Sequence, residues 1–302
     1  MDRTVTTVID SEKCIGCGLC VKVCPSRTLS MQDEKAVVTG DRSLQCGHCA
    51  VVCPVDAVTV NAVDKESSRF STFAREDSWL PFGEFDTVQL VRLMGSRRSC
   101  RNYLSKPVDR SILDDLVKIG VTAPSGTNSQ SWTFTVLPTR KAVVNLAERI
   151  AAFFRKLNRV SENRYVRGFL KLIGRTELDE YYREYHDSVE EALAEWKTSG
   201  IDRLLHGATA AIVVGSRPGA SCPAEDALLA TQNILLAAHS MGLGTCLIGF
   251  AVEAMRRDKR IKRSLGIPDD EKVYSVIALG YPDERYRRVG VRKKYVQRYY
   301  EA

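Results

Sequence analysis

The 302-residue sequence contains only four histidines and no apolar run that approaches the length of a membrane-spanning helix. Such a helix needs about 20 consecutive apolar residues, so we expect no membrane span. The histidines lie in no Ser/His/Asp arrangement and at no metal-ligand spacing, which argues against hydrolysis. We expect His48, which lies between cysteines, to be a surface residue rather than a ligand. The four are His48, His186, His206 and His239.

Further absences bear on location and partners. The first residues, Met-Asp-Arg-Thr-Val-Thr, contain no apolar segment typical of a secretory signal, so with the free thiols we expect a cytoplasmic protein. The net charge of +7 comes from scattered Lys and Arg, densest around 155–175, 256–263 and 285–298. No nucleic-acid-binding motif accompanies it, so the charge favours acidic electron carriers or a phosphate-bearing cofactor. A dinucleotide fingerprint is also absent, because Gly242-Leu-Gly244 has no third glycine and follows a helical pattern.

Cysteine, by contrast, is concentrated at one end: seven of the ten cysteines lie in the first 53 residues. They form one complete run, C-x2-C-x2-C-x3-C-P, and one shorter run, C-x2-C-x3-C-P. In proteins with two [4Fe-4S] clusters, the fourth Cys of such a run ligates the other cluster. The spacing therefore predicts a redox protein. The seven candidate iron ligands are Cys14, Cys17, Cys20, Cys24, Cys46, Cys49 and Cys53.

Two other interpretations of these cysteines are weaker. A disulfide scaffold needs an oxidising compartment. A zinc ribbon would use two C-x2-C pairs and leave Cys20, Cys24 and Cys53 without a role. The remaining cysteines have no mutual spacing, and we expect them to be small buried apolar residues. They are Cys100, Cys222 and Cys246.

The shorter run lacks its first ligand, because Ser43 stands at the position that corresponds to Cys14. The second site could hold a [4Fe-4S] cluster with a serine, aspartate or water ligand, a [3Fe-4S] cluster, or no cluster. Each half predicts a ligand loop, a short helix and a strand, and we expect the two strands to pair. Residues 1–62 resemble bacterial two-[4Fe-4S] ferredoxins, with clusters that hold a small fold together.

The rest of the chain predicts an α+β domain. Residues 63–85 form a connector whose aromatics we expect to pack on one of the domains. Helices are expected from Asp86 to about Met94, from about Asp109 to Ile119, over 140–200, and from Pro223 to Gly242, while strands are expected at 132–136, 210–215, 247–250 and 273–279. This order suggests one mixed sheet wrapped in helices.

The chemistry of this domain lies between its elements. Gly95-Ser-Arg-Arg-Ser-Cys-Arg-Asn-Tyr103 carries guanidinium groups suited to a phosphate or an anionic ring. Ala123-Pro-Ser-Gly-Thr-Asn-Ser-Gln-Ser-Trp132 offers small and amide side chains to a planar heterocycle. Met241-Gly-Leu-Gly-Thr-Cys-Leu-Ile-Gly-Phe250 is a glycine-rich turn from helix to strand, and Arg292-Lys293-Lys294 follows the last strand.

In this order, residues 86–298 resemble the FMN-dependent nitroreductase family. The resemblance implies that Arg97, Arg98 and Ser99 bind the flavin phosphate and its N1/O2 edge, with Arg101 nearby. It also implies that Ser125 and Asn128 line a flavin across a dimer interface. Backbone N–H groups of Leu247, Ile248 and Gly249 would face the flavin N5, and Arg292 and Lys293 would complete the phosphate site. Residues 150–205 match no family pattern and are expected to form a helical substrate lid.

The sequence thus predicts a ferredoxin-like domain over 1–62 and a nitroreductase-like FMN domain over 86–302, in a homodimer. We expect an enzyme in which clusters relay single electrons to FMN, which reduces a small nitro, alkene or quinone substrate. The electron donor would be a ferredoxin, a flavodoxin or NAD(P)H. The alternatives are a flavoprotein that oxidises NAD(P)H and passes electrons outward, and an electron-transfer subunit of a larger complex. Tyr103, Tyr165 and Tyr181 are candidate proton donors, although packing roles are more usual for tyrosine.

Overall fold

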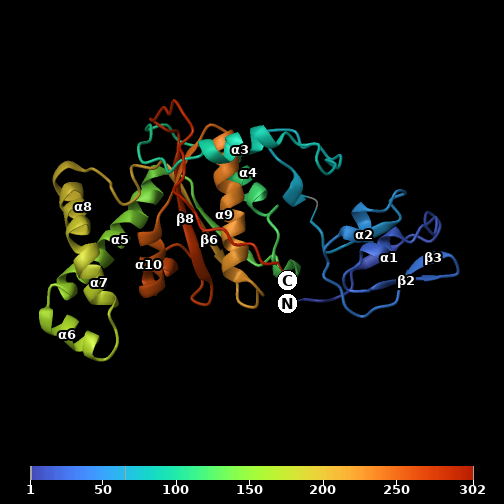
Figure 1. The fold of residues 1–302 in the computed structure, drawn as a ribbon, viewed down its shortest axis with the longest axis horizontal. Helices are drawn as coiled ribbons and strands as arrows, with labels where there is room; N and C mark the ends of the chain where they lie inside the picture. The colour runs from blue at the N-terminus through green and yellow to red at the C-terminus, as the bar shows by residue number, and fades with distance from the viewer. Residues whose placement is uncertain (1, 65, 302) are drawn as a thin grey trace.

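The computed structural model describes residues 2–64 and 66–301 (Figure 1). A small N-terminal module lies at one end of the molecule and a larger domain of helices around a sheet lies beside it. Helices α6, α7 and α8 lie at the end farthest from the module. Within the described ranges, no helix is both long and apolar enough to cross a membrane.

The N-terminal module contains two short helices and two antiparallel sheets of two strands each. The strand that follows each helix does not pair with its counterpart, so the expected pairing of the two halves is wrong. Instead β2 pairs with β3 through a tight turn at Asp33 and Glu34, both with positive φ, and β4 pairs with β1. A two-residue turn makes the local partner the accessible one. The elements are β1 (Thr7–Ile9), α1 (Leu19–Val23), β2 (Leu29–Gln32), β3 (Lys35–Val38), α2 (His48–Val51) and β4 (Val58–Val60).

The connector holds to the larger domain through its backbone rather than its aromatic rings. After the short helix η1 (Glu66–Ser68), the N–H groups of Ser71 and Thr72 donate to the fully buried carboxylate of Asp115 at 2.7–3.0 Å. Trp79 and Phe82 remain 74% and 95% exposed. The expectation that the connector's aromatics pack on a domain is therefore wrong for these rings within one chain.

Helices α3 (Thr87–Ser96) and α4 (Arg110–Gly120) begin and end close to the predicted positions. The Asp86 carboxylate caps α3 by accepting from the N–H groups of Val88 and Gln89. In α4 the apolar stripe includes Leu113 and Leu116, both fully buried.

A four-stranded sheet forms the centre of the larger domain. Its order is β5-β6-β8-β7, and its strands pair antiparallel, while an isolated parallel bridge joins Ser99 to Thr245. The strand predicted at 247–250 is shifted: the strand ends at Leu247, and Gly249 already begins a helix, because the residues that reach β8 are the buried Thr245 and Cys246. The strands are β5 (Trp132–Leu137), β6 (Ala210–Ser216), β7 (Gly244–Leu247) and β8 (Lys272–Gly280).

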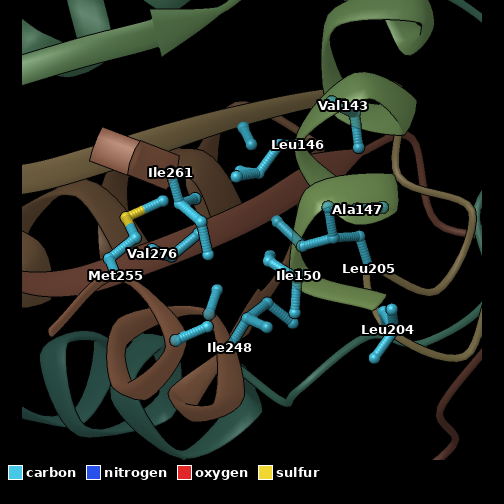
Figure 2. Close-up of a cluster of buried hydrophobic side chains, with 14 of the residues drawn as sticks. Val143, Leu146, Ala147, Ile150, Leu204, Leu205, Ile248, Met255, Ile261 and Val276 are labelled. Atoms are coloured by element: carbon cyan, nitrogen blue, oxygen red, sulfur yellow. The ribbon is translucent and has the colours of Figure 1, made fainter. Parts of the chain in front are cut away.

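Helices cover both faces of the sheet, and alternate residues of β6 face alternate cores. Ile212 and Val214 pack with α4 and α9 in one core, whereas Val213 packs with α5, α10 and α11 in the other. Figure 2 shows part of the second core, where side chains of α5 meet Ile248, which precedes α10, and Met255, Ile261 and Val276, which lie farther along the chain. The remaining helices are α5 (Arg140–Ser161), α6 (Arg164–Leu172), α7 (Glu177–Glu184), α8 (His186–Ser199), α9 (Pro223–Ser240), α10 (Gly249–Arg257) and α11 (Lys259–Arg263).

Candidate functional site

The seven N-terminal cysteines fold into two neighbouring groups. Burial raises the pKa of Cys20, and the charges of Cys14 and Cys17 raise it further, so these three thiols lie together. Burial likewise raises the pKa of Cys49, with added contributions from Cys24 and Cys46. The fourth cysteine of the complete run therefore lies with the shorter run, as the two-cluster pattern predicts.

Backbone N–H groups point at the sulfurs that the chain brings together. The N–H of Thr28 donates to Cys24 Sγ at 3.4 Å, and the N–H of Ala57 donates to Cys53 Sγ at 3.2 Å. These two bonds span the same four-residue interval in the two halves of the module. Such donors stabilise thiolates and tune the potential of a cluster.

Backbone N–H groups also donate to the sulfur of Cys14, the first cysteine of the complete run. Hydrogen bonds from the Ala36 and Gly16 N–H groups lower the pKa of Cys14. Thiolate is the form of cysteine that binds metal. The donor set of the module therefore fits iron–sulfur clusters.

A cavity in the module joins Ser43 to Cys24, Cys46 and Cys49. Over residues 2–64 and 66–301, no group of three or more His, Cys, Asp or Glu side chains could hold one metal ion. Cluster thiolates each bind a different iron atom, so they stand farther apart than the ligands of one ion. His48 is exposed beside this cavity, as expected.

Three arginines gather where α3 ends. Burial lowers the pKa of Arg97, and the charges of Arg292 and Arg98 lower it further. Among the described residues, no carboxylate forms an ion pair with any of the three. Like charges held together without a counter-ion favour an anion between them. Gly290 lets the tail approach, because a Cβ there would lie 2.8 Å from the Arg98 guanidinium.

The basic cavity at this point continues toward the sheet edge. Arg97, Arg98 and Cys100 line it, together with Gly244 and Thr245 of β7. The strand end is packed tightly here, since a Cβ on Gly244 would lie 2.7 Å from Cys100 Cβ. Burial raises the pKa of the Cys100 thiol to about 11. Cys100 and Cys246 are buried as expected, but the same expectation is wrong for Cys222, which is exposed.

A second, larger cavity of about 1060 Å³ opens where β7 ends. This volume is slightly above the roughly 300–1,000 Å³ typical of small-molecule sites. Leu247, Ile248 and Gly249 line it, and so does Arg101. Helices α7 and α8 supply much of the opposite wall, so residues within the expected lid do border the cavity.

The hydrogen bonds of residues 247–249 limit which of their backbone N–H groups could donate to a flavin. Ile248 N–H already donates to Val276 O at 2.9 Å, so it is not available to a cofactor. Gly249 lies in the first turn of α10, where N–H groups have no intrahelical acceptor. No atom lies within 4 Å of where its Cβ would be, which leaves room for a flat group.

Ser125 and Asn128 lie on a separate loop, over 125–130, and not with the arginines. The buried Asp226 carboxylate holds this loop by accepting from Gly126 N–H at 2.8 Å and Ser129 Oγ at 3.0 Å. Asn128 Nδ2 donates to the backbone carbonyl of Leu44 in the N-terminal module at 2.9 Å.

The three candidate proton-donor tyrosines and the basic C-terminal tail differ in how exposed they are. The Tyr103 hydroxyl donates to the carbonyls of Cys100 and Ala278, so Tyr103 has a structural role. Tyr165 is 73% exposed, whereas Tyr181 lines the large cavity. Lys293 lies in the exposed tail that also carries Arg292.

Sequence reasoning missed two residues of these sites. His206 lines the large cavity with a φ of +57°, and burial and the nearby Arg101 lower its pKa. A histidine followed by Gly207 was a possible signal for a left-handed turn. Asp226 gave no signal, because its partners lie about 100 residues away in sequence.

Comparisons with known proteins agree with this division of the chain. Residues 94–281 match the sequence model of the nitroreductase family, and residues 13–57 match that of the 4Fe-4S dicluster domain. The chain is 26% identical over 188 residues to an NADH dehydrogenase of Thermus thermophilus, which covers 62% of this chain and 84% of that protein. It is 26% identical over 232 residues to a 4-nitrobenzoate reductase of a Nocardioides strain, which covers 72% and 90%. A crystal structure of a nitroreductase with bound FMN from Bacteroides fragilis aligns with a TM-score of 0.49 at 24% identity, covering 69% of this chain and 95% of that one.

Proposed function

The chain belongs to the nitroreductase family, and on this basis we propose that it is an FMN-dependent oxidoreductase that reduces a small organic substrate. Iron–sulfur clusters in the N-terminal module supply the electrons one at a time. A nitro compound is the favoured substrate class, because a 4-nitrobenzoate reductase is among the relatives. Alkenes and quinones are the other members of the proposed class.

The unpaired arginine group is the observation that carries this proposal. Arg97, Arg98 and Arg292 together offer a multidentate, positively charged site for the FMN phosphate. The adjacent cavity continues from these arginines to β7, which leads to the cavity that would hold the substrate. When bound, FMN accepts single electrons and delivers an electron pair as a hydride equivalent.

The large cavity supports a planar organic substrate. Four aromatic rings line it and contact one another: Phe250 meets Phe154 at 5.4 Å and Tyr185 at 5.8 Å between ring centroids, both edge-to-face, and Tyr181 stacks on Phe154 at 6.2 Å. Such rings favour a flat apolar molecule between them and exclude water. We propose residues 150–205 as the substrate lid. They include three of these rings, Phe154 on α5, Tyr181 on α7 and Tyr185 directly after α7.

A homodimer completes the flavin site in this proposal. Ser125 and Asn128 precede the edge strand β5, whereas Leu247 ends β7 and Gly249 follows it at the other edge of the sheet. One chain cannot place both pairs on one flavin, but two chains can exchange them.

The exposed face of α3 supports the same assembly. No residue of this helix is buried, and Val88 and Val91 are 72% and 60% exposed. An apolar helix face left open in a single chain is typical of an interface. Since the arginine group follows this helix, a second copy that covers α3 would also enclose the phosphate site.

The decisive experiment measures cofactors and electron entry in anaerobically purified protein. FMN, iron and sulfide are assayed, and flavin reduction is then followed by stopped-flow with reduced ferredoxin or with NAD(P)H. We expect both cofactor types and faster flavin reduction by the ferredoxin. Protein without flavin contradicts the proposal, and reduction by NAD(P)H alone reverses the proposed electron flow.

A further inference from the structure

The second cluster site has an oxygen where the first has a sulfur. Ser43 lines a cavity with Cys24, Cys46 and Cys49, and it is buried to the same extent as Cys14, at 8% and 9% exposed. A buried hydroxyl at this position is unusual for serine, which is mostly exposed in proteins.

The backbone around Ser43 repeats that around Cys14. The N–H two residues after each one donates to its side chain: Gly16 to Cys14 Sγ, and Gln45 to Ser43 Oγ at 3.0 Å. Gly16 has a φ of +71° and Gln45 a φ of +53°. Glutamine adopts this left-handed conformation at a cost that glycine avoids. The Gln45 side chain offsets this cost with a 2.8 Å bond to Thr4 O.

The next turn is repeated as well. Gly18 and Gly47, which each precede a short helix, have φ values of +69° and +74°. The chain therefore keeps the whole ligand-loop geometry of the first site at the second one. The buried Ser43 hydroxyl therefore occupies the position in its loop that the Cys14 thiol occupies in the first one.

We propose that Ser43 Oγ is the fourth protein ligand of a second [4Fe-4S] cluster, with Cys24, Cys46 and Cys49 as the other three. This inference rests on the proposed function, which assigns clusters to the module. The hydroxyl releases its proton to solvent as the Fe–O bond forms, and no electron is transferred. Asp41 is exposed and does not line the cavity, and Cys222 also lies outside it, so neither is placed to serve instead.

Iron content and electron paramagnetic resonance of the intact anaerobic protein test this ligand. We expect Ser43→Ala to lose one iron per chain and to show a [3Fe-4S] signal, because no ligand remains for the fourth iron. Ser43→Cys should retain all the iron and resist conversion in air better than the wild-type protein. Cys222→Ser is the matched control and should not change the spectrum.

Unchanged iron content and spectrum in Ser43→Ala would overturn the Ser43 ligand while leaving the proposed function intact. Loss of iron in Cys222→Ser, with no loss in Ser43→Ala, would assign the ligand to Cys222 and also overturn it. Wild-type protein without any cluster would instead contradict the proposed function itself.

A separate contact shows which part of the larger domain faces this cluster. Asn128 Nδ2 donates to Leu44 O, and the Arg3 guanidinium donates to Thr127 O at 3.3 Å. Leu44 lies next to Ser43 and lines the same cavity. The second cluster is therefore adjacent to the 125–130 loop.

The flavin-facing segment of the same chain is remote from this loop. Trp132 pairs with Ser216, which pairs with Lys272 of β8, whereas Leu247 pairs with Ile277 of β8. Three strand spacings of about 4.8 Å separate the two edges, roughly 14 Å, and the five residues from 272 to 277 add about 16 Å along the strands. Figure 1 shows the N-terminal module and helices α6–α8 at opposite ends of the molecule.

We infer that each module passes electrons to the flavin of the partner subunit. Electron transfer weakens steeply with distance, and the own-chain route crosses the sheet, whereas the shared-site dimer proposed above brings the 125–130 loop to the partner's flavin. In each transfer one electron leaves the reduced cluster, which is oxidised, and reduces the flavin by one electron. An external reduced ferredoxin replenishes the cluster, and two transfers supply one electron pair.

Mixed dimers test the direction of this transfer. One chain carries Cys46→Ala and Cys49→Ala, which remove cluster ligands, and the other carries Arg97→Ala and Arg98→Ala, which weaken flavin binding. Two different affinity tags allow purification of the mixed dimer with its single flavin. The measurement is stopped-flow bleaching of that flavin by reduced ferredoxin, without any substrate.

Transfer between subunits predicts bleaching of the mixed dimer at close to the wild-type rate per flavin, because the intact module faces the intact flavin. Bleaching no faster than in the homodimer without cluster ligands overturns the inference and leaves the proposed enzyme intact. If that homodimer itself bleaches at the wild-type rate, no cluster relay operates and the proposed function fails too. Iron and FMN contents of each purified dimer verify that the substitutions removed only the intended group.

Discussion

The Asp226 carboxylate accepts hydrogen bonds from the Gly126 N–H and, through its other oxygen, from the Ser129 hydroxyl. It thereby fixes a loop whose Thr127 and Asn128 have positive φ angles of 51° and 56°. Residues other than glycine are held in this region only where the surroundings over-determine the backbone. One buried side chain of α9 thus positions the loop that makes hydrogen bonds to Leu44 and Arg3 of the N-terminal module.

Replacing Asp226 tests this anchor. Asp226→Ala should lower the free energy of unfolding by about 1–3 kcal/mol, because it leaves buried donors unsatisfied. It should also reduce FMN retention. Chemical denaturation and flavin release measure the two effects, and Asp109→Asn is a control, since exposed Asp109 makes no side-chain cap bond. If Asp226→Ala keeps full stability and FMN retention, the loop keeps its conformation without the Asp226 carboxylate.

The arginine group should determine flavin affinity. Arg97→Ala or Arg98→Ala removes charge-assisted bonds of about 1.5–3 kcal/mol, which weakens FMN roughly ten- to a hundredfold. Fluorescence titration with FMN measures this change. The exposed Arg110 on α4 provides the control, Arg110→Ala, and iron content should stay constant in all three variants. If both Arg97 and Arg98 can be removed without loss of FMN, the phosphate lies elsewhere.

The first cluster should depend on its own cysteines. Cys20→Ala should lower iron and sulfide and weaken the broad visible absorbance, while FMN stays bound in the other domain. Cys222→Ala, which alters an exposed thiol outside the two runs, should change neither. Stoichiometric zinc in the wild-type protein would contradict the iron–sulfur assignment.

Assembly should require the open face of α3. Val91→Glu puts a charge on an apolar surface that a second copy would cover, and it should yield monomers that release FMN. Light scattering with flavin quantitation measures both. Leu172→Glu, on an 86% exposed residue of α6, is the control and should remain dimeric. A Val91→Glu dimer with full flavin would place the interface on another surface.

The proposed lid, residues 150–205, should loosen as the pH rises. A hydrogen bond that the His186 ring donates to the Asp187 carboxylate raises the pKa of His186 above its ordinary value of 6.5, and Glu162, at the end of α5, raises it further. A raised folded-state pKa means that the stabilisation is complete below pH 6.5 and disappears as the pH rises through the folded value. Hydrogen exchange of α7 and α8, corrected for intrinsic rate, should increase over that interval in the wild-type protein.

His186→Gln removes the titrating group and should flatten this pH dependence. Peptides from β6, which is buried along its length, serve as the internal control. Equal pH dependence in the variant and the wild-type protein would mean that another group controls the lid.

Local pattern predicted much of the fold. The helical spacing of apolar residues predicted α4, because a helix buried on one face repeats its apolar residues with the period of the helix. The continuous apolar run predicted β6, because a strand buried on both faces needs apolar residues at every position. The glycine-rich turn before β7 was misjudged by three residues, since the strand boundary depends on which residues reach β8. The exposed rings of Trp79 and Phe82 were also misjudged, because composition does not reveal whether a neighbour is present to cover them.

The sequence by itself determined the chemistry of this protein. Cluster ligands lie within a few residues of one another, so their spacing alone reports the iron–sulfur site, and the Arg97–Arg98 pair is likewise adjacent in the chain. Only the tertiary structure decided how these sites relate. The Asn128–Leu44 bond, the separation of the loop from Leu247 and the seating of Ser43 among cysteines join residues that are distant in sequence. Such contacts follow from the packing of whole elements, and no local pattern encodes them.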